Sequence, residues 1–495
     1  MHLGRHIRQE AQMASTVRAA RLLGETEVGP GSRSLPEEFR RDLRAKIRLA
    51  AEAWPAIRNL SFQERVALCL RVGQGLAEVQ SDLEELLVEE AGNPRKFARW
   101  EAARATETAL DFPQVLEEIK PRDLPARRGR NVLYHEPYGV VGVMSPGNAP
   151  LVVPLYNLLS ALGAGNAVVL RPSAHAPTVA HRLVDLFYRA GAPAHTIQIS
   201  TCRAEEATWE FIENPLVRVL VTYAGSAVGK DNLVKLGRYL EGTTRRVKGC
   251  LQIDGRLLHY VPELAGNDPL IVLDGADLEA AAGAAVVGAF ANAGQLCFSA
   301  KRILVEDRVA GEFRTRFASR VSSLRVGDAA DPEVDVVPIR DPRTVRRSVY
   351  QFEEALRKGG TLLTGGFTED EKILPTLIEF DARALLDRAP EEKPFLWVEE
   401  AFAPIRSLVV FRGDEQCLAL ANDSVYGLGA SIFGPVDRAL ALARRLESAR
   451  VAVNESPLFG DPHLPIGGIK DSGLRGSPHK VHELTYVKRI HVGQG

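Results

Sequence analysis

The stretch VVGVMSPGNAPLVVPLYNLLSALGAGNAVVLRPS, residues 140–173, determines the fold class. It opens with a short apolar run, Val140–Met144, that stops at Ser145-Pro146-Gly147. Leucines with helical spacing follow, and after Gly165-Asn166 a second apolar run begins at Ala167. Buried apolar strands that alternate with helices are typical of a parallel sheet covered by helices on both faces. We therefore predict an α/β fold with a doubly wound sheet.

A third apolar strand, Val217 to Val221, continues the pattern and leads through Tyr223 into Gly225-Ser226 and a helix. Ligands bind to such sheets at the carboxyl ends of the strands. Backbone N–H groups and the helix dipole at Gly225 and Ser226 favour a phosphate there, although many strand–helix turns contain glycine without binding one. The turn is not a P-loop, because the glycine spacing is one residue short and Asp231 stands where Ser or Thr would hold magnesium.

Composition sets further limits. The chain has 495 residues, enough for two to four domains, and 62 Lys+Arg balance 63 Asp+Glu. A net charge of −1 provides no field to concentrate nucleic acid or an anionic membrane, so we expect neither as a partner. No run of apolar residues is long enough to predict a membrane span, and the N-terminal segment lacks a signal-peptide pattern. Five cysteines without paired spacing favour reduced thiols, no metal site and a cytoplasmic location.

Three polar residues stand out in turn-like contexts. Cys297 follows Gly294-Gln295, unlike a core cysteine, although a lone cysteine is more often core filler. Glu263 lies at a strand–turn junction, where an isolated glutamate is usually exposed. Asn148 lies between glycine and proline neighbours and would ordinarily be a turn former.

Taken in order, however, these loops resemble the aldehyde dehydrogenase superfamily. The similarity extends from about residue 40 to 492, nearly the whole chain, and seven motifs carry it. These are SPGNAP at 145–150, LRPS at 170–173, YAGS at 223–226, ELAG at 263–266, GQLC at 294–297, EEAFAP at 399–404 and PIGGIKDSG at 465–473, which resemble the family patterns SPxNxP, KPS, FTGS, ELGG, GQxC, EExFGP and PFGGxKxSG.

The resemblance implies that an aldehyde is oxidised to a carboxylic acid through a cysteine thiohemiacetal and thioester, with hydride transfer to NAD or NADP. Cys297 would be the nucleophile, and Asn148 with the Cys297 backbone N–H would stabilise the oxyanion. Glu263 would be the general base that activates water. The implied cofactor-binding residues are Ser145, Pro146, Arg171, Ser173, Ala174, Gly225, Ser226, Glu400 and Phe402. Ala174 stands where NAD-selective members often place a glutamate that repels a ribose 2′-phosphate, so NADP is permitted.

Some positions depart from the family pattern. Gly147 and Ala149 replace aromatic residues around Asn148, and Ile466 replaces another, which predicts a roomier site or one lined by other rings, for instance Tyr156, Phe298 or Phe459. Asn157 stands where a lysine commonly assists proton relay, which brings turnover into question. Two alternatives therefore stay open: an aldehyde dehydrogenase that passes the acyl group to CoA, and a family member with impaired catalysis that serves as a binding or structural protein. The presence of Glu263 favours hydrolysis over CoA transfer.

The resemblance also implies a domain organisation. Residues 1–35 would form a tail, 36–118 and 138–265 the nucleotide-binding domain, 266–471 the catalytic domain, and 119–137 with 472–495 a small β oligomerisation element. The C-terminal stretch Thr485–Val492 reads as an exposed strand, which predicts a homodimer or homotetramer. Two β-rich arms around Asp254-Gly255 predict an additional type I′ hairpin.

Overall fold

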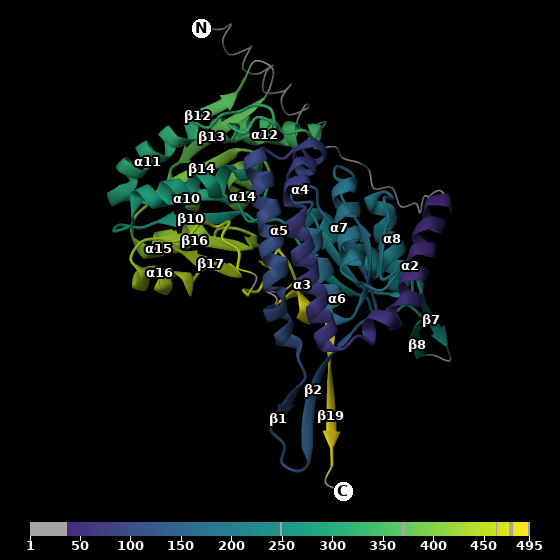
Figure 1. Ribbon diagram of the computed structural model, residues 1–495. Helices are drawn as coiled ribbons and strands as arrows, with labels where there is room; N and C mark the ends of the chain where they lie inside the picture. Colours follow the sequence, from purple (N-terminus) through teal and green to yellow (C-terminus); the bar gives the residue numbers. More distant parts are fainter. Residues whose placement is uncertain (1–36, 248–249, 369–371, 462, 475–478, 494–495) are drawn as a thin grey trace.

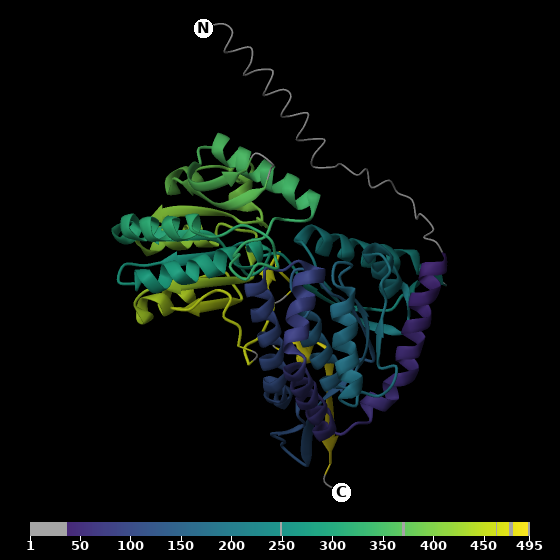
Figure 2. The ribbon, with the colours of Figure 1, turned by 45° about the horizontal axis from the view of Figure 1, so that its top comes forward.

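The computed structural model has two α/β halves, each built on one sheet covered by helices, and a projecting β arm (Figure 1). It describes residues 37–247, 250–368, 372–461, 463–474 and 479–493. The predicted tail, residues 1–35, lies outside the described residues. The two halves lie side by side (Figure 2). The chain passes from the first half to the second between strand β9 (His259–Glu263) and strand β10 (Asp268–Val272).

The first sheet has five parallel strands in the order β5-β4-β3-β6-β9. The remaining four strands are β3 (Val140–Met144), β4 (Ala167–Arg171), β5 (Ile197–Ile199) and β6 (Val217–Tyr223). The three strands predicted from the sequence are confirmed: every residue of β3 is buried, as are four of the five residues of β4 and five of the seven residues of β6. All five carboxyl ends lie at one edge of the sheet, and that edge carries the loops with the sequence motifs.

Helices cover both faces of this sheet, as expected for a doubly wound fold. One face packs on α2 (Glu37–Arg58) and α8 (Ala204–Glu213), the other on α6 (Val152–Ala164) with α3 (Phe62–Glu78), α5 (Arg95–Leu116) and α7 (Pro177–Arg189) around it. The other elements of this half are α4 (Gln80–Leu86), the π-helix η1 (Leu87–Ala91), the 3-10 helix η2 (Glu117–Ile119) and α9 (Ser226–Gly242). A capping box begins α3, where Ser61 and Glu64 bond reciprocally.

The second sheet has seven strands in the order β12-β13-β14-β11-β10-β16-β17, and only β12 runs antiparallel. Its strands besides β10 are β11 (Ala300–Glu306), β12 (Thr361–Phe367), β13 (Ile373–Phe380), β14 (Ile405–Phe411), β16 (Gly429–Phe433) and β17 (Arg450–Val453). Helices α10 (Leu278–Phe290) and α11 (Asp307–Ser322) cover one face. The opposite face packs on α12 (Pro342–Arg357), α13 (Ala382–Leu386), α14 (Phe395–Val398), α15 (Gly413–Asn422) and α16 (Val436–Ala443). Short 3-10 helices η3 (Ala291–Gly294) and η4 (Pro390–Glu392) complete this half.

The projecting arm is a three-stranded antiparallel sheet. Strand β2 (Arg130–Pro137) pairs on one side with β1 (Arg122–Leu124) and on the other with β19 (Thr485–Val492). The predicted C-terminal strand is therefore confirmed. It follows the short helix α17 (Lys480–Glu483), which packs on α6.

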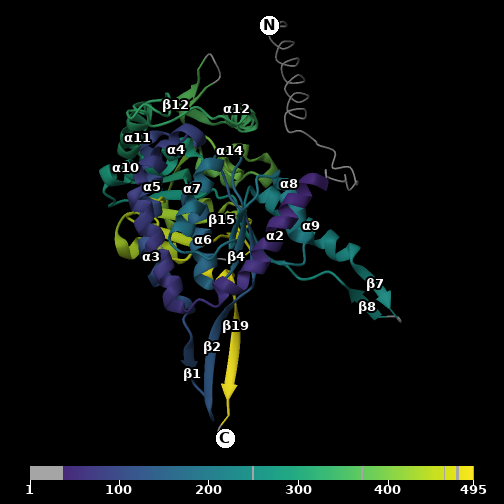
Figure 3. The same ribbon diagram turned by 45° about the vertical axis from the view of Figure 1, so that its right-hand side comes forward.

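The predicted hairpin around Asp254-Gly255 is wrong in its register. The paired strands are β7 (Thr244–Val247) and β8 (Cys250–Ile253), so Asp254-Gly255 comes after the hairpin and not at its tip. Gly255 packs against the Thr243 side chain instead, which explains why a small residue stands there. The hairpin projects from the first half at the end of α9 (Figure 3).

A further two-stranded ladder joins β15 (Tyr426–Gly427) to β18 (Ile469–Lys470). Residues just after β18 also contact the first half, because Leu264 donates a backbone hydrogen bond to Ser472. Among the described helices none is long and apolar enough to cross a membrane. The same residues contain no group of three or more His, Cys, Asp or Glu side chains placed to hold a metal ion.

Candidate active site

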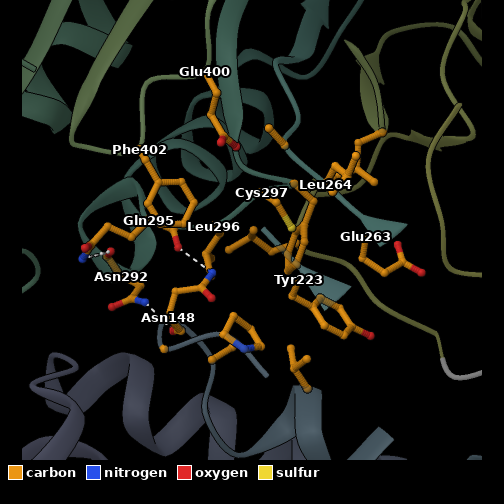
Figure 4. Close-up of a pocket in the computed structure, with 18 of the residues that line it drawn as sticks. Asn148, Tyr223, Glu263, Leu264, Asn292, Gln295, Leu296, Cys297, Glu400 and Phe402 are labelled. Atoms are coloured by element: carbon orange, nitrogen blue, oxygen red, sulfur yellow. Dashed lines mark hydrogen bonds between the residues drawn. The ribbon is translucent and has the colours of Figure 1, made fainter. Parts of the chain in front are cut away.

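A cavity of about 1070 Å³ lies where the two halves meet. Residues from both halves line it, so motifs that are far apart in the sequence face one space (Figure 4). The sequence-predicted residues that line this cavity are Pro146, Asn148, Gly225, Ser226, Glu263, Cys297, Glu400 and Phe402. Arg171 is the last residue of β4, and Ser145, Ser173 and Ala174 lie in the adjoining loops at the carboxyl ends of β3 and β4.

Cys297 is presented by an unusual turn between α10 and β11. Asn292, Ala293 and Gly294 have φ values of 51°, 55° and 72°, three consecutive left-handed residues where the helix would otherwise continue. The buried Arg406 of β14 holds this turn, because its guanidinium donates to the Gly294 carbonyl at 3.2 Å. The turn directs the cysteine into the cavity instead of the core of the second half.

The thiol of Cys297 is protonated at rest. Loss of solvation raises the pKa of Cys297 to about 12; Lys301 opposes this rise, and Glu400 adds to it. The thiolate is the nucleophilic form of cysteine, so a proton must leave this site before the sulfur can attack a carbonyl carbon. The other cysteines whose burial is described, Cys69, Cys202 and Cys417, are buried and free, which matches the core reading.

The buried Lys301 contacts the backbone of the loop that carries Cys297. Its side chain is 1% exposed, and its ammonium donates to the carbonyl oxygens of Leu296 (2.7 Å) and Cys297. The same ammonium lies 3.2 Å from Glu400 Oε1. One buried cation therefore contacts both the backbone at Cys297 and the carboxylate of Glu400.

Asn148 reaches the nucleophile loop from the first half. Its Nδ2 donates to the Gln295 carbonyl at 2.8 Å, and its own carbonyl accepts from Asn292 Nδ2 at 2.7 Å. Glu101, which is fully buried, accepts the N–H groups of Leu151 and Val152 at 2.9 and 3.0 Å and so caps the start of α6. Hydrogen bonds to the Cys297 loop on one side and to Glu101 on the other thus hold the loop that carries Asn148.

Glu263 is the last residue of β9, and its side chain is 9% exposed. Its carboxylate forms a buried ion pair with Lys480, which is fully buried at the start of α17. The carboxylate points away from the Cys297 sulfur (Figure 4). The usual reading of an isolated glutamate, an exposed position, does not hold here.

The first half offers an anion-binding edge. Helix α9 begins directly after β6, and no side chain caps its N-terminus at Gly225. The Ser226 hydroxyl donates to the Asp471 carbonyl, so the backbone N–H groups of the first turn are the donors that face the cavity. The Ser145 hydroxyl is buried without a hydrogen-bond partner among the described residues, an orphaned polar atom at the same edge.

These features fit a dinucleotide, since an uncapped helix start receives a pyrophosphate and a carboxylate receives ribose hydroxyls. Arg171 donates to the Cys202 carbonyl at 3.1 Å, and Ser173 accepts from the His175 N–H at 3.1 Å. Ala174 is exposed and neutral, so no carboxylate stands at that position.

The departures from the family pattern have spatial explanations. An added Cβ at Gly147 would lie 2.6 Å from Ser173 Oγ, so a tight loop contact occupies the room that a ring would need. Tyr156, Phe298 and Phe459 all line the cavity, as the alternative reading predicted. Asn157 is buried and donates to the Tyr223 hydroxyl at 2.9 Å.

Sequence reasoning missed four residues of this site: Glu101, Lys301, Arg406 and Lys480. Lys301 left a signal, because a charged pair opens the otherwise apolar strand β11. No sequence pattern pointed to Lys480, since it lies among polar residues 217 positions after Glu263.

Comparison with known proteins agrees with this geometry. The model of the aldehyde dehydrogenase family matches residues 33–490. The chain belongs to the aldehyde dehydrogenase family. It is 34% identical over 470 residues to a vanillin dehydrogenase of Pseudomonas fluorescens, covering 92% of this chain and 90% of that protein. It is 30% identical over 457 residues to a benzaldehyde dehydrogenase of Bacillus subtilis, with 90% and 87% covered.

Among solved structures, a glyceraldehyde-3-phosphate dehydrogenase of Methanocaldococcus jannaschii complexed with NADP has a TM-score of 0.81 and 28% identity, covering 92% of this chain and 95% of that one. The protein is an NAD(P)-dependent aldehyde dehydrogenase, an enzyme that oxidises an aldehyde to a carboxylic acid. The predicted family, fold class, activity and cofactor are confirmed, and the CoA-acylating and impaired alternatives are not favoured.

Proposed function

We propose that Cys297 is the nucleophile of this dehydrogenase, with Asn148 and Glu263 as its partners. The observation that carries the proposal is that Cys297 alone of the cysteines with described burial opens on the cavity, opposite the amide of Asn148. The Cys297 thiol releases its proton to solvent, and the thiolate attacks the aldehyde carbon and forms a thiohemiacetal.

The oxyanion of that intermediate needs donors already in place. An amide NH2 has two N–H groups, and the described Asn148 hydrogen bond to Gln295 uses one of them. The second N–H and the backbone N–H of Cys297 stabilise the oxyanion. When the thiohemiacetal has become a thioester, Glu263 accepts a proton from water, whose oxygen adds to the acyl carbon.

NAD(P)+ bound in the cavity would supply the hydride acceptor. Glu400 and Phe402 would hold its nicotinamide end, and Gly225 with the first turn of α9 would hold the pyrophosphate. Ser145 and Pro146 would contact the cofactor between these ends, and Arg171, Ser173 and Ala174 would receive its adenosine. We propose that NADP is accepted as well as NAD, because Ala174 is neutral and Arg171 stands nearby.

The substrate class that fits best is an aromatic aldehyde. Trp100, Tyr156, Phe298 and Phe459 place rings on the cavity wall, and flat substrates pack well against such rings. The vanillin and benzaldehyde dehydrogenases to which the chain is similar bear names of the same substrate class.

We further propose that the three units predicted from the sequence act as nucleotide-binding domain, catalytic domain and oligomerisation arm. Strand β19 pairs with β2 on one side, and Tyr486, Val487 and Ile490 are exposed on it. Exposed apolar side chains on an edge strand favour pairing with a second copy, so we expect a homodimer or homotetramer. A catalytic free thiol favours a reducing compartment such as the cytoplasm.

The direct test is reduction of NAD+ and NADP+ by the purified protein, followed by absorbance, with benzaldehyde, vanillin and short aliphatic aldehydes. We expect turnover that is fastest with the aromatic aldehydes and absent in Cys297→Ala. Turnover that survives in Cys297→Ala would refute the assignment of the nucleophile, and a preference for aliphatic aldehydes would refute the substrate class.

A further inference from the structure

The C-terminal segment brings a buried lysine to the base. Lys480 and Glu263 are 0% and 9% exposed, and Lys480 Nζ donates to Glu263 Oε1. Two charges withdrawn from water stabilise each other only while both are ionised. The charge state of Glu263 therefore depends on the presence of Lys480.

The surroundings of Lys480 make it a permanent cation. Its ammonium lies 5.9 Å from the centroid of the Tyr223 ring, whose hydroxyl accepts from Asn157 at 2.9 Å. Burial lowers the pKa of Lys480, but Glu263 and Tyr223 more than offset burial, and the net pKa is raised above its ordinary value. Glu263 is the carboxylate in direct contact with this cation among the described residues.

The pair also sets the direction of the base. Glu263 contacts Lys480, and its carboxylate points away from the Cys297 sulfur (Figure 4). A carboxylate must come within hydrogen-bond reach of the water that it activates. The contact with Lys480 therefore holds the carboxylate of Glu263 away from the Cys297 sulfur.

Contacts from other elements fix the segment that carries Lys480. Glu483 lies 3.0 Å from His259 Nε2, and the Leu484 carbonyl accepts from Asn166 Nδ2 at 2.9 Å. Strand β19 begins at the next residue and pairs with β2. The position of Lys480 thus depends on the docking of the C-terminal segment onto the first half.

We propose that Lys480 is a positioning residue for thioester hydrolysis: it keeps Glu263 ionised and held back until the acyl group is on Cys297. The inference rests on the proposed function. In the hydrolytic step an O–H bond of water breaks, its proton passes to the Glu263 carboxylate and the oxygen bonds to the acyl carbon. The C–S bond then breaks and the carboxylic acid leaves. The sulfur takes the proton from Glu263, and the carboxylate pairs again with Lys480.

Removal of the cation leaves a buried carboxylate without a partner, which favours its protonated form and removes the base. In Lys480→Met we expect the first turnover, read as a burst of reduced cofactor, to stay within about twofold of wild type. The steady-state rate should fall about tenfold or more, as in Glu263→Gln. The acyl-enzyme should accumulate and be visible as a mass increase in the intact protein.

Two further measurements separate this role from simple loss of structure. Hydroxylamine attacks thioesters without a general base, so it should restore steady-state turnover in Lys480→Met. The double variant Lys480→Met/Glu263→Gln should be no slower than Glu263→Gln alone, because the lysine acts through the glutamate. Lys393→Met is the matched control, since Lys393 is 7% exposed and pairs with Asp423 at 2.6 Å, outside the site.

The control should leave the ratio of burst rate to steady-state rate unchanged. Equal losses of burst and steady-state rate in Lys480→Met, with no acyl-enzyme and no response to hydroxylamine, would overturn the proposal. So would an unchanged steady-state rate, or a further loss in the double variant. A wild-type protein with no turnover of any aldehyde would instead refute the proposed function, and this inference with it.

Discussion

Replacement of Gly294 by alanine is the sharpest test of how the nucleophile is held. Gly294 has a φ of +72°, and a Cβ there would lie 2.1 Å from Arg406 Nη2 and 2.7 Å from the Ala403 carbonyl. The left-handed backbone costs alanine roughly 1 kcal/mol. Overpacking of a close-fitted site adds about 1–3 kcal/mol, so we expect a destabilisation of about 3 kcal/mol.

The same change should also affect catalysis. Arg406 Nη2 donates to the Gly294 carbonyl at 3.2 Å and to Ser299 Oγ at 3.3 Å, so displacement of the guanidinium moves the loop on both sides of Cys297. A misplacement of about 1 Å at a reacting group costs roughly 10²-fold in rate. We therefore expect kcat to fall about a hundredfold in protein that remains folded.

The assay combines urea unfolding with steady-state reduction of NAD(P)+. Gly311→Ala is the matched control: Gly311 lies within α11, and no heavy atom lies within 4 Å of its added Cβ. That substitution should stabilise the protein by about 0.5–1 kcal/mol and leave kcat unchanged. If Gly294→Ala were as stable and as active as wild type, the argument from the left-handed turn and its Arg406 contact would be refuted.

Three further predictions test the surroundings of the site. Asn148→Ala should lower kcat about 10²–10³-fold without weakening cofactor binding measured by fluorescence, and a loss below tenfold would exclude the amide as an oxyanion donor. Lys301→Met should raise the pKa of Cys297 further, because Lys301 lowers it, and should slow alkylation of the free enzyme by iodoacetamide about tenfold at pH 9; an unchanged rate would contradict this. Burial raises the pKa of Glu101 from 4.5 to about 7, so the native state binds this proton more tightly than the unfolded chain and loses stability as the pH rises through that window. Glu101→Gln lacks this loss, and its stability relative to wild type in urea unfolding should rise by about 2 kcal/mol between pH 5.5 and 8; a pH-independent difference would refute it.

The loops of the site could be predicted from the sequence because each is a local pattern. Strand β3 consists of consecutive buried residues followed by Ser145-Pro146, and such a run predicts both the strand and the loop after it. Cys297 was recognisable from its glycine-rich approach together with the order of the other motifs. The hairpin was misread because Asp254-Gly255 has turn chemistry, while the actual pairing of β7 with β8 depends on nonlocal registration of the strands.

The sequence by itself determined the fold class and the family, and it suggested which residues to propose for the reaction, since strand periodicity and motif spacing are properties of neighbouring residues. Only the tertiary structure decided how those residues are held. Lys480 meets Glu263 across 217 positions, and Arg406 meets the turn at Gly294 across 112. A buried charge must find its partner wherever the packed core places one, and no local pattern records which distant segment supplies it.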